Sequence, residues 1–304
     1  MKAVIDIGTN TFHLNIANVL PNNKIVFVYK TYKAVKLGEG GINQGIIAPA
    51  AYIRGVNALL GFSKTIAKYP VKQVIALATS AVRDAQNGEK FIADVLQKTD
   101  ISIQTISGNT EAQLIYEGTK AALNLTNNTF LIMDIGGGSI EFIICNQKQI
   151  FWKQSFKLGA ARLMDLFMKN NPLLFSDIQN IENHLNQNLV DLFEACKTFN
   201  PTILVGTSGS FESYAEIIHL QQELSFNPHK QKSYPFNNQK LVDLLNFFKT
   251  STQQQRLTTK GLIALRLDMI VIASVITSFI LHKLNINKTI LSTYALKEGA
   301  LLTF

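Results

Sequence analysis

Cysteine, charged residues and long apolar runs are all scarce in this 304-residue sequence. The two cysteines, Cys145 and Cys196, stand in apolar segments, so they predict buried thiols in a reducing compartment and exclude a disulfide framework for so long a chain. Charged residues make up only 16% of the chain, which argues against long disordered tails. Because the N-terminal residues follow no signal-peptide pattern, we expect a cytoplasmic protein.

The lack of a long apolar run bears on membrane association. The longest uncharged apolar run, residues 269–281, has thirteen residues. A membrane-spanning helix needs about 20. We therefore expect a buried helix at this position and no membrane partner.

Positive charge is in excess, with 29 Lys and Arg residues against 21 Asp and Glu residues. A net charge of +8 favours encounters with polyanions, although many basic proteins use their charge only for solubility. The sequence lacks clustered basic runs, zinc-ligand spacing and RNA-binding signatures, so nucleic acid is not the expected partner.

One short segment occurs twice. Asp6–Thr11 reads DIGTNT, and Asp134–Ser139, 128 positions later, reads DIGGGS. Each copy follows a strand-like run and precedes alternating apolar sequence that is interrupted by a polar turn. This alternation is typical of antiparallel hairpins. The repeat therefore predicts two similar lobes.

The remaining pattern alternates helices with strands. In the first half we expect helices at 50–67, 89–98 and 110–123 and strands at 74–79 and 101–106. In the second half we expect helices at 160–169, 176–198, 239–249 and 262–281 and strands at 202–205 and 289–291. This mixed order predicts an α/β fold. The polar segment 124–128 separates an N-terminal lobe, 1–124, from a C-terminal lobe, 125–304.

Both glycine segments are candidate phosphate-binding turns. A tight turn between strands lets backbone N–H groups point into one small space, and such a nest of amides binds phosphate oxygens. Two turns that face each other would hold a phosphate chain from both sides, whereas two ordinary hairpin turns are the alternative. The candidate phosphate-binding residues are Gly8, Thr9, Asn10, Thr11, Gly136, Gly137, Gly138 and Ser139.

The aspartate that opens each segment suggests a metal ion. Asp6 and Asp134 would repel a bare phosphate, but a hard cation such as Mg²⁺ prefers carboxylate and water ligands. An alternative role for each is to accept hydrogen bonds from the turn backbone. Glu141 follows the second turn on an apolar strand. We interpret Asp134 and Glu141 as candidate Mg²⁺ ligands, with a solvent-facing Glu141 as the alternative.

Further short segments stand in a definite order along the chain. They are Ala78–Ala85, Ile106–Gly108 leading into Glu111, Leu158–Leu163, Gly206–Ser210, Arg266–Asp268 and Lys297–Gly299. Together with the two glycine segments they resemble, over essentially the whole chain, the exopolyphosphatase / guanosine pentaphosphate phosphohydrolase family, which is part of the actin-like ATPase superfamily.

The resemblance implies an α/β fold of two similar actin-like, ribonuclease H-like lobes with an active-site cleft between them. It also implies Mg²⁺-dependent hydrolysis of a terminal phosphoanhydride, with Glu111 as the catalytic base and Arg83 as a phosphate ligand. Two alternatives stay open. Glu111 could be a glutamate that the helix dipole favours at a helix N-terminus, and Arg83 could form a surface salt bridge with Asp84 or Glu89.

Two other positions need an interpretation. In actin-like proteins the glycine loop equivalent to 206–210 touches the nucleotide. We therefore expect Gly206, Ser208 and Gly209 to contact the distal part of the substrate, with a packing turn as the alternative. His13 stands in an alternating apolar strand and is interpreted as a hydrogen-bonded core histidine.

The expected substrate is inorganic polyphosphate, because the chain is short and basic. Guanosine pentaphosphate is the alternative, since no guanine-specific signature separates the two. Thr110, Gln113 and Lys297 depart from the family pattern, so a non-catalytic polyphosphate or nucleotide sensor is a further alternative. A homodimer is an expectation from the family alone.

Overall fold

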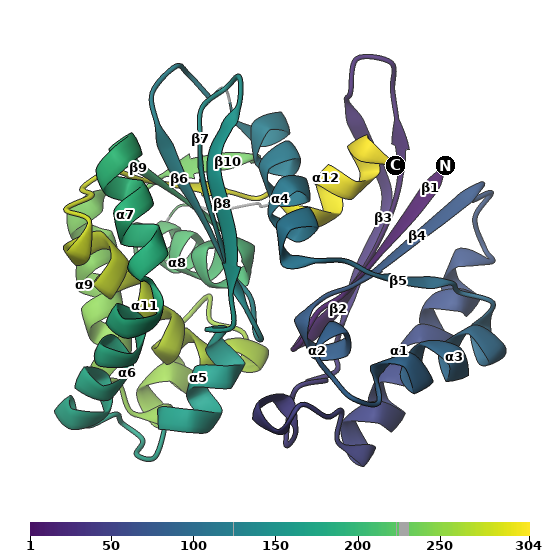
Figure 1. Cartoon of the computed structure of the whole chain (residues 1–304), viewed down its shortest axis with the longest axis horizontal. Coiled ribbons are helices and arrows are strands. Elements are labelled where there is room, and N and C mark those ends of the chain that lie inside the picture. Colours follow the sequence, from purple (N-terminus) through teal and green to yellow (C-terminus); the bar gives the residue numbers. More distant parts are fainter. Residues whose placement is uncertain (124, 223, 225–230) are drawn as a thin grey trace.

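The computed structural model describes residues 1–123, 125–222, 224 and 231–304, which form two lobes (Figure 1). The first lobe is built on a five-stranded sheet in the order β3-β2-β1-β4-β5. Three of its strands pair in antiparallel fashion and the other two continue the sheet in parallel. The strands are β1 (Lys2–Ile7), β2 (Thr11–Val19), β3 (Ile25–Ala34), β4 (Gln73–Ala78) and β5 (Ile103–Thr105).

The second lobe is built on a six-stranded sheet in the order β10-β11-β9-β6-β7-β8. Its helices cover this sheet and bury a large apolar core. The strands are β6 (Phe130–Ile135), β7 (Ile140–Cys145), β8 (Ile150–Phe156), β9 (Ile203–Thr207), β10 (Ser233–Pro235) and β11 (Thr289–Ser292). The helices are α5 (Ala160–Phe167), α6 (Phe175–Asn188), α7 (Val190–Phe199), α8 (Ser208–Gln221), α9 (Asn238–Thr250), α10 (Gln253–Thr258) and α11 (Met269–Lys283), with a 3₁₀ turn, η2, at Ala264–Arg266.

The helices of the first lobe divide into two groups. One face of its sheet buries a core that includes Phe62 and Phe91, which come from α1 and α3. A second core lies between the two sheets and includes residues of α4 and α12. The helices are η1 (Ile42–Gln44), α1 (Pro49–Ile66), α2 (Ser80–Arg83), α3 (Gly88–Thr99), α4 (Gly108–Ala122) and, from the C-terminus, α12 (Leu296–Thr303).

Strand pairing preserves the sequence repeat. In the first lobe Asp6 lies opposite His13, and in the second lobe Asp134 lies opposite Glu141, so both partners are displaced by 128 positions. Each lobe then places a parallel strand beside its central strand, β4 beside β1 and β9 beside β6. The prediction of an α/β fold with two similar lobes is confirmed.

Several predicted elements differ in their extent. The predicted helix 176–198 is two helices, α6 and α7, which are separated at Leu189. The predicted helix 262–281 starts only at Met269, because Gly261 adopts a φ of 90° and η2 intervenes. The short elements α10, α12 and β10 were not predicted. The predicted lobe boundary includes Asn124, which lies outside the described residues, and stays a prediction.

The C-terminal helix α12 packs against α4 and β1, at the junction of the lobes (Figure 1). Two glycines allow the helices to approach closely. A Cβ atom on Gly118 of α4 would collide with the carbonyl group of Ala295, and a Cβ atom on Gly299 of α12 would collide with that of Leu114. The backbones of the two helices therefore touch directly, which ties the end of the chain to the first lobe.

Replacing either glycine by alanine should destabilise the protein. We expect Gly118→Ala and Gly299→Ala each to lower the free energy of unfolding by about 1–3 kcal/mol or more, because overpacking must push backbone against backbone. The matched control is Gly61→Ala in α1, where a Cβ atom would meet no described atom within 4 Å. There, the higher helix propensity of alanine should stabilise the protein by about 0.5–1 kcal/mol. Urea denaturation measures all three, and equal stabilities would contradict the close helix contact.

Candidate active site

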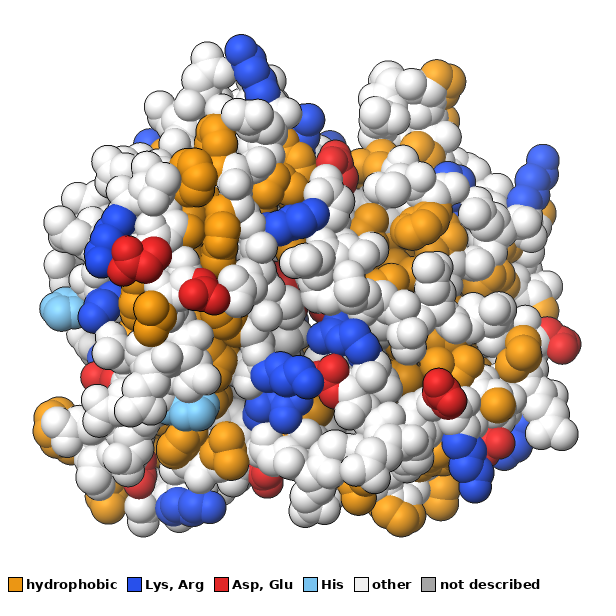
Figure 2. All heavy atoms as spheres, viewed as in Figure 1, with side chains coloured by type: hydrophobic (Ala, Val, Ile, Leu, Met, Phe, Trp, Pro, Cys, Tyr) orange, Lys and Arg blue, Asp and Glu red, His pale blue; other side chains and the backbone are white. Residues whose placement is uncertain are grey.

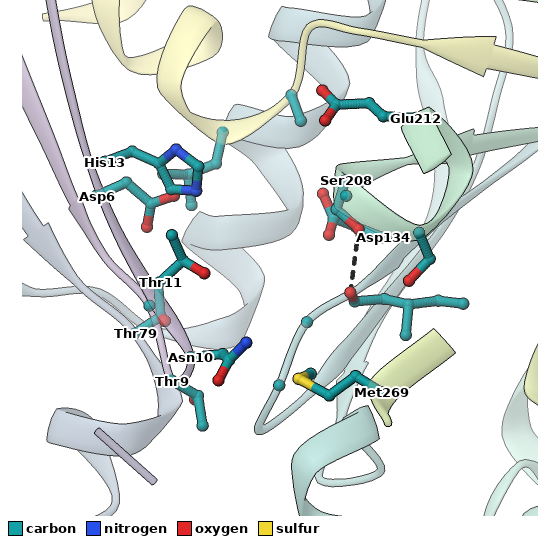
Figure 3. A pocket seen from close by; sticks show the side chains of 18 of the residues that line it. Asp6, Thr9, Asn10, Thr11, His13, Thr79, Asp134, Ser208, Glu212 and Met269 are labelled. Carbon is teal, nitrogen blue, oxygen red and sulfur yellow. Dashed lines mark hydrogen bonds between the residues drawn. The ribbon is translucent and has the colours of Figure 1, made fainter. Parts of the chain in front are cut away.

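Both glycine turns line one cavity of about 210 Å³ between the lobes. Figure 3 shows Asp6, Thr9, Asn10 and Thr11 on one side of this space and Asp134 and Ser208 on the other. The eight candidate phosphate-binding residues of the turns line it, whereas Arg83, the ninth, is not among the described residues that do. The structure thus brings the two turns together, as the sequence predicts, while phosphate binding itself stays a prediction.

The two turns contact each other directly. A Cβ atom on Gly137 would lie 3.0 Å from Cβ of Thr9, and one on Gly138 would collide with the hydroxyl of Ser80. The backbone of the second turn is held by α5, because the N–H groups of Ala160 and Ala161 donate to the carbonyl oxygens of Gly136 and Gly137 at 2.9 and 2.8 Å. The second turn needs glycine because the opposite lobe leaves no room for a side chain.

Five carboxylates of the described residues line the cavity, and two of them accept hydrogen bonds from hydroxyl groups. The hydroxyl of Thr207 donates to Oδ2 of Asp134 at 2.7 Å, and that of Ser155 donates to Oε1 of Glu141 at 2.6 Å. Asp134 and Glu141 are both buried. A third, Glu212, pairs with Arg266 at 3.0 Å, and Asp6 and Glu111 complete the set.

The cavity disfavours the charged forms of these acids. Burial raises the pKa of Asp6 to about 6, and Asp134 adds to the effect while Lys297 opposes it. Burial, with the charge of Asp134, raises the pKa of Glu141 to about 7. The pKa of Asp134 is also raised by burial. A cation bound among these acids would favour their charged forms.

Glu111 lies in the first turn of α4, where Ser107 caps the helix by accepting a hydrogen bond from the Thr110 N–H group at 3.1 Å. Nη1 of Arg83 donates to Oε2 of Glu111 at 3.1 Å and to the carbonyl oxygen of Ile106 at 3.0 Å. Burial, followed by the charge of Glu141, raises the pKa of Glu111 well above its ordinary value, although Arg83 opposes this shift. A raised pKa makes the carboxylate form of Glu111 a stronger base.

A family model described as the Ppx/GppA phosphatase family matches residues 16–304. The chain belongs to this family. It is 37% identical to an exopolyphosphatase of Cytophaga hutchinsonii of known structure, with a TM-score of 0.96 over 99% of this chain and 96% of that one. A Ppx/GppA family member of Aquifex aeolicus, 22% identical with a TM-score of 0.81 over 99% and 96% of the two chains, has the same fold.

Curated relatives of this Ppx/GppA phosphatase include two kinds of protein. A bifunctional 3-dehydroquinate synthase/phosphatase of Fusobacterium nucleatum is 32% identical over 291 residues, which are 92% of this chain but only 43% of that protein. Exopolyphosphatase 1 of Mycobacterium tuberculosis is 25% identical over 300 residues, which are 98% of this chain and 86% of that protein. The predicted family and the two-lobed α/β fold are confirmed.

The loop after β9 reaches the cavity only in part. Ser208 and Gly209 line it, and the Ser208 hydroxyl donates to the carbonyl oxygen of Ile135 at 3.0 Å (Figure 3). Gly206 is not among the described lining residues; it lies within β9, where a Cβ atom would collide with the ring of Phe211. The expected substrate contact of Gly206 is therefore corrected to a packing role.

Several lining residues received no role at the site from the sequence, among them His13, Tyr32 and Glu212. Arg266 and Lys297 also line the cavity, although the sequence pointed to them only as members of short motifs. The interpretation of His13 as a core residue is wrong, because His13 is partly exposed in the cavity wall. Burial, followed by the charge of Lys297, lowers the pKa of His13 well below its ordinary value. The repeat held the necessary signal, since His13 stands 128 positions before Glu141.

Arg162 of this phosphatase connects the lobes near the second turn. Its Nη1 atom donates to the carbonyl oxygen of Ile42 at 2.9 Å and its Nε atom to that of Gly138 at 3.2 Å. Nδ2 of Asn43, in η1, donates to Oδ2 of Asp165, in α5, at 2.7 Å. We call this set of polar bonds between η1 and α5 the clasp.

Basic side chains surround Asp84 beside the clasp. The carboxylate of Asp84 lies 3.4 Å from Arg83, 3.5 Å from Lys157 and 3.8 Å from Arg162. Figure 2 shows Lys and Arg side chains gathered around an acidic one in the middle of this face. Both the salt bridge expected as an alternative for Arg83 and its contact with Glu111 are therefore present.

Two absences complete the description. Within the described part of the chain, no three His, Cys, Asp or Glu side chains are arranged in advance to hold a metal ion. Among the same residues, no helix combines the length and the apolar character that crossing a membrane requires.

Asp6→Asn should stabilise the phosphatase at alkaline pH. The ordinary pKa of 3.8 holds in the unfolded chain and the value of about 6 in the folded one. The free energy of unfolding therefore falls as the pH rises from 3.8 to about 6, because the folded protein holds the proton of Asp6 more tightly than the unfolded chain does. We expect Asp6→Asn to raise the free energy of unfolding at pH 8 by up to about 3 kcal/mol, and by little at pH 4.

The control is Asp100→Asn, which makes the same change at an exposed position. Denaturation at both pH values measures the two variants. If Asp6→Asn does not raise the free energy of unfolding at pH 8, the ionised Asp6 carboxylate does not destabilise the folded protein.

Proposed function

We propose that this protein is an exopolyphosphatase that releases the terminal phosphate of inorganic polyphosphate in the presence of Mg²⁺. One observation carries the proposal: two backbone-amide turns and a buried glutamate, held by an arginine, face the same cavity. The exopolyphosphatases of Cytophaga hutchinsonii and Mycobacterium tuberculosis, which this chain resembles over 98% or more of its length, support it.

The residues divide the chemistry among them. The N–H groups of the two turns, with the hydroxyls of Thr9 and Ser139, bind oxygens of the terminal phosphates. Glu111 accepts a proton from a water molecule whose oxygen forms the new bond to the terminal phosphorus. The bridging P–O bond breaks, and its electron pair stays on the shortened chain. Arg83 fixes the orientation of the Glu111 carboxylate.

The charge of the cavity explains why a cation belongs to the proposal. Five carboxylates line it against only two cationic side chains, Arg266 and Lys297. A polyanion would meet net repulsion there unless a cation neutralised the carboxylates. Mg²⁺ commonly binds through one or two carboxylates, substrate phosphates and water, so it does not need a preassembled group of three. Asp134 and Glu141 would hold it, and it would neutralise charge on the phosphates.

Guanosine pentaphosphate remains the second candidate substrate. The cavity extends beyond the turns to a wall that includes Tyr32, Ile263, Leu265 and Met269. A bare phosphate chain has no use for apolar and aromatic side chains, whereas a nucleoside could pack on them. The homodimer and the cytoplasmic location stay predictions.

Glu111→Gln should reduce kcat by about 10²–10⁴, which is the usual contribution of a general base, with little change in KM. Glu117→Gln is the control, since it makes the same change two turns along α4 at a residue that does not line the cavity. Colorimetric phosphate release from polyphosphate measures both variants. An unaltered kcat in Glu111→Gln would remove Glu111 from the mechanism.

Phosphate release should require Mg²⁺ and should be faster from pure polyphosphate than from guanosine pentaphosphate. EDTA should abolish it, because the carboxylates then face the substrate without a counter-cation, and excess Mg²⁺ should restore it. The assay compares kcat/KM for chains of several lengths and for the pentaphosphate. Release from the pentaphosphate alone would favour the second candidate, and binding without turnover of either would favour a sensor.

A further inference from the structure

Lys297 is a cation of the cavity that forms no ion pair with the residues that the structure describes. It lies in the first turn of α12 and lines the cavity. Arg266, in contrast, donates to Glu212 at 3.0 Å and to Ser213 at 2.8 Å. Within the described residues, the Lys297 ammonium group has neither a hydrogen bond nor an ion pair of this kind. It is therefore available to a ligand.

Charges from both lobes keep Lys297 protonated. Burial acts to lower its pKa, but four surrounding carboxylates outweigh burial and raise it. They belong to Glu298 of α12, Asp6 of β1, Glu212 of α8 and Asp134 of β6. The ammonium group thus lies in the field of the aspartates that open the two glycine turns.

The start of α12 is held in place. The Glu298 carboxylate accepts hydrogen bonds from Nδ2 of Asn15 at 3.3 Å and from the N–H group of Ala295 at 3.0 Å. Gly299, one residue further, is pressed against the backbone of Leu114. Figure 3 shows this helix, in pale yellow, above the space between Asp6 and Asp134. Lys297 is therefore positioned before any substrate arrives.

Lys297 and Glu111 lie on different sides of the turns. Glu111 is held by Arg83, which follows β4. Glu298, the neighbour of Lys297, instead accepts a hydrogen bond from Asn15 of β2. Strand β1, which leads into the first turn, stands between β2 and β4 in the sheet. If Glu111 activates the water that attacks the terminal phosphate, Lys297 lies on the side of the chain that leaves.

We propose that Lys297 binds the phosphate next to the scissile bond on the leaving chain. This inference rests on the proposed function and identifies a further catalytic residue for it. When the bridging P–O bond breaks, the electron pair stays on the bridging oxygen, and the ammonium group stabilises the negative charge that forms there. The ligand class is a phosphate in anhydride linkage, which polyphosphate and nucleoside polyphosphates share.

Binding tests the inference without turnover. Tripolyphosphate is titrated calorimetrically into Glu111→Gln protein and into the same protein carrying Lys297→Met or Lys297→Arg. We expect Lys297→Met to weaken binding about 10–100-fold, as for loss of a charged hydrogen bond. Lys297→Arg should stay within about threefold of the parent. The control is Lys90→Met, which removes an exposed lysine of α3. Equal affinity of the Lys297→Met and parent proteins would overturn the inference.

Turnover separates this inference from the proposed function. In otherwise wild-type protein, Lys297→Met should lower kcat by about 10²–10³ as well as raise KM, and Lys297→Arg should restore most of kcat. A rise in KM with an unchanged kcat would overturn the transition-state role. Failure of the wild-type protein to hydrolyse polyphosphate, with tripolyphosphate binding still dependent on Lys297, would refute the exopolyphosphatase activity and leave the binding role standing.

A measurement on the wild-type protein covers the case in which Lys297→Met does not fold. Lysine acetylation is followed by mass spectrometry with and without saturating tripolyphosphate. We expect tripolyphosphate to protect Lys297 and to leave the acetylation of Lys90 unchanged. Acetylation of Lys297 at the same rate in both samples would overturn the inference.

Discussion

The contact of the two glycine turns across the lobe junction is the constraint on which the site depends. Gly137 and Gly138 lie so close to Thr9 and Ser80 that no side chain fits between them. This approach brings the backbones of the two turns into one small space, and the charge of Asp134 helps to raise the pKa of Asp6. The same packing that suits a phosphate chain therefore leaves the free protein with crowded negative charge.

The residues that depart from the family pattern do not disturb this arrangement. The backbone of Thr110 is capped by Ser107, and the side chain of Gln113 donates to Glu117 and accepts from Lys153. Neither Thr110 nor Gln113 is among the described residues that line the cavity. Lys297 keeps a positive charge at its position. The catalytic interpretation therefore agrees better with the structure than a sensor that has lost its chemistry.

The sequence predicted those features of the fold and the site that depend on residues close together in the chain. The repeated hexapeptide predicted two similar lobes. The family resemblance carried by the short motifs singled out Glu111 and Arg83, whose side chains are in contact in the structure. The Lys297–Gly299 motif did not predict that Lys297 lines the cavity, because its place depends on a backbone contact between α4 and α12, which are far apart in sequence. His13 was misread because its alternating strand resembles any core strand until its pairing with Asp6 is known.

The clasp and the α4–α12 contact differ in the free energy that is needed to break them. Polar bonds between η1 and α5 can be exchanged for bonds to water at little net cost in free energy. Parting α4 from α12 would instead expose the apolar core between the two sheets. Separating the lobes beside Arg162 would therefore cost less free energy than separating them at α12. The C-terminal helix is thus the stiffer of the two connections between the lobes.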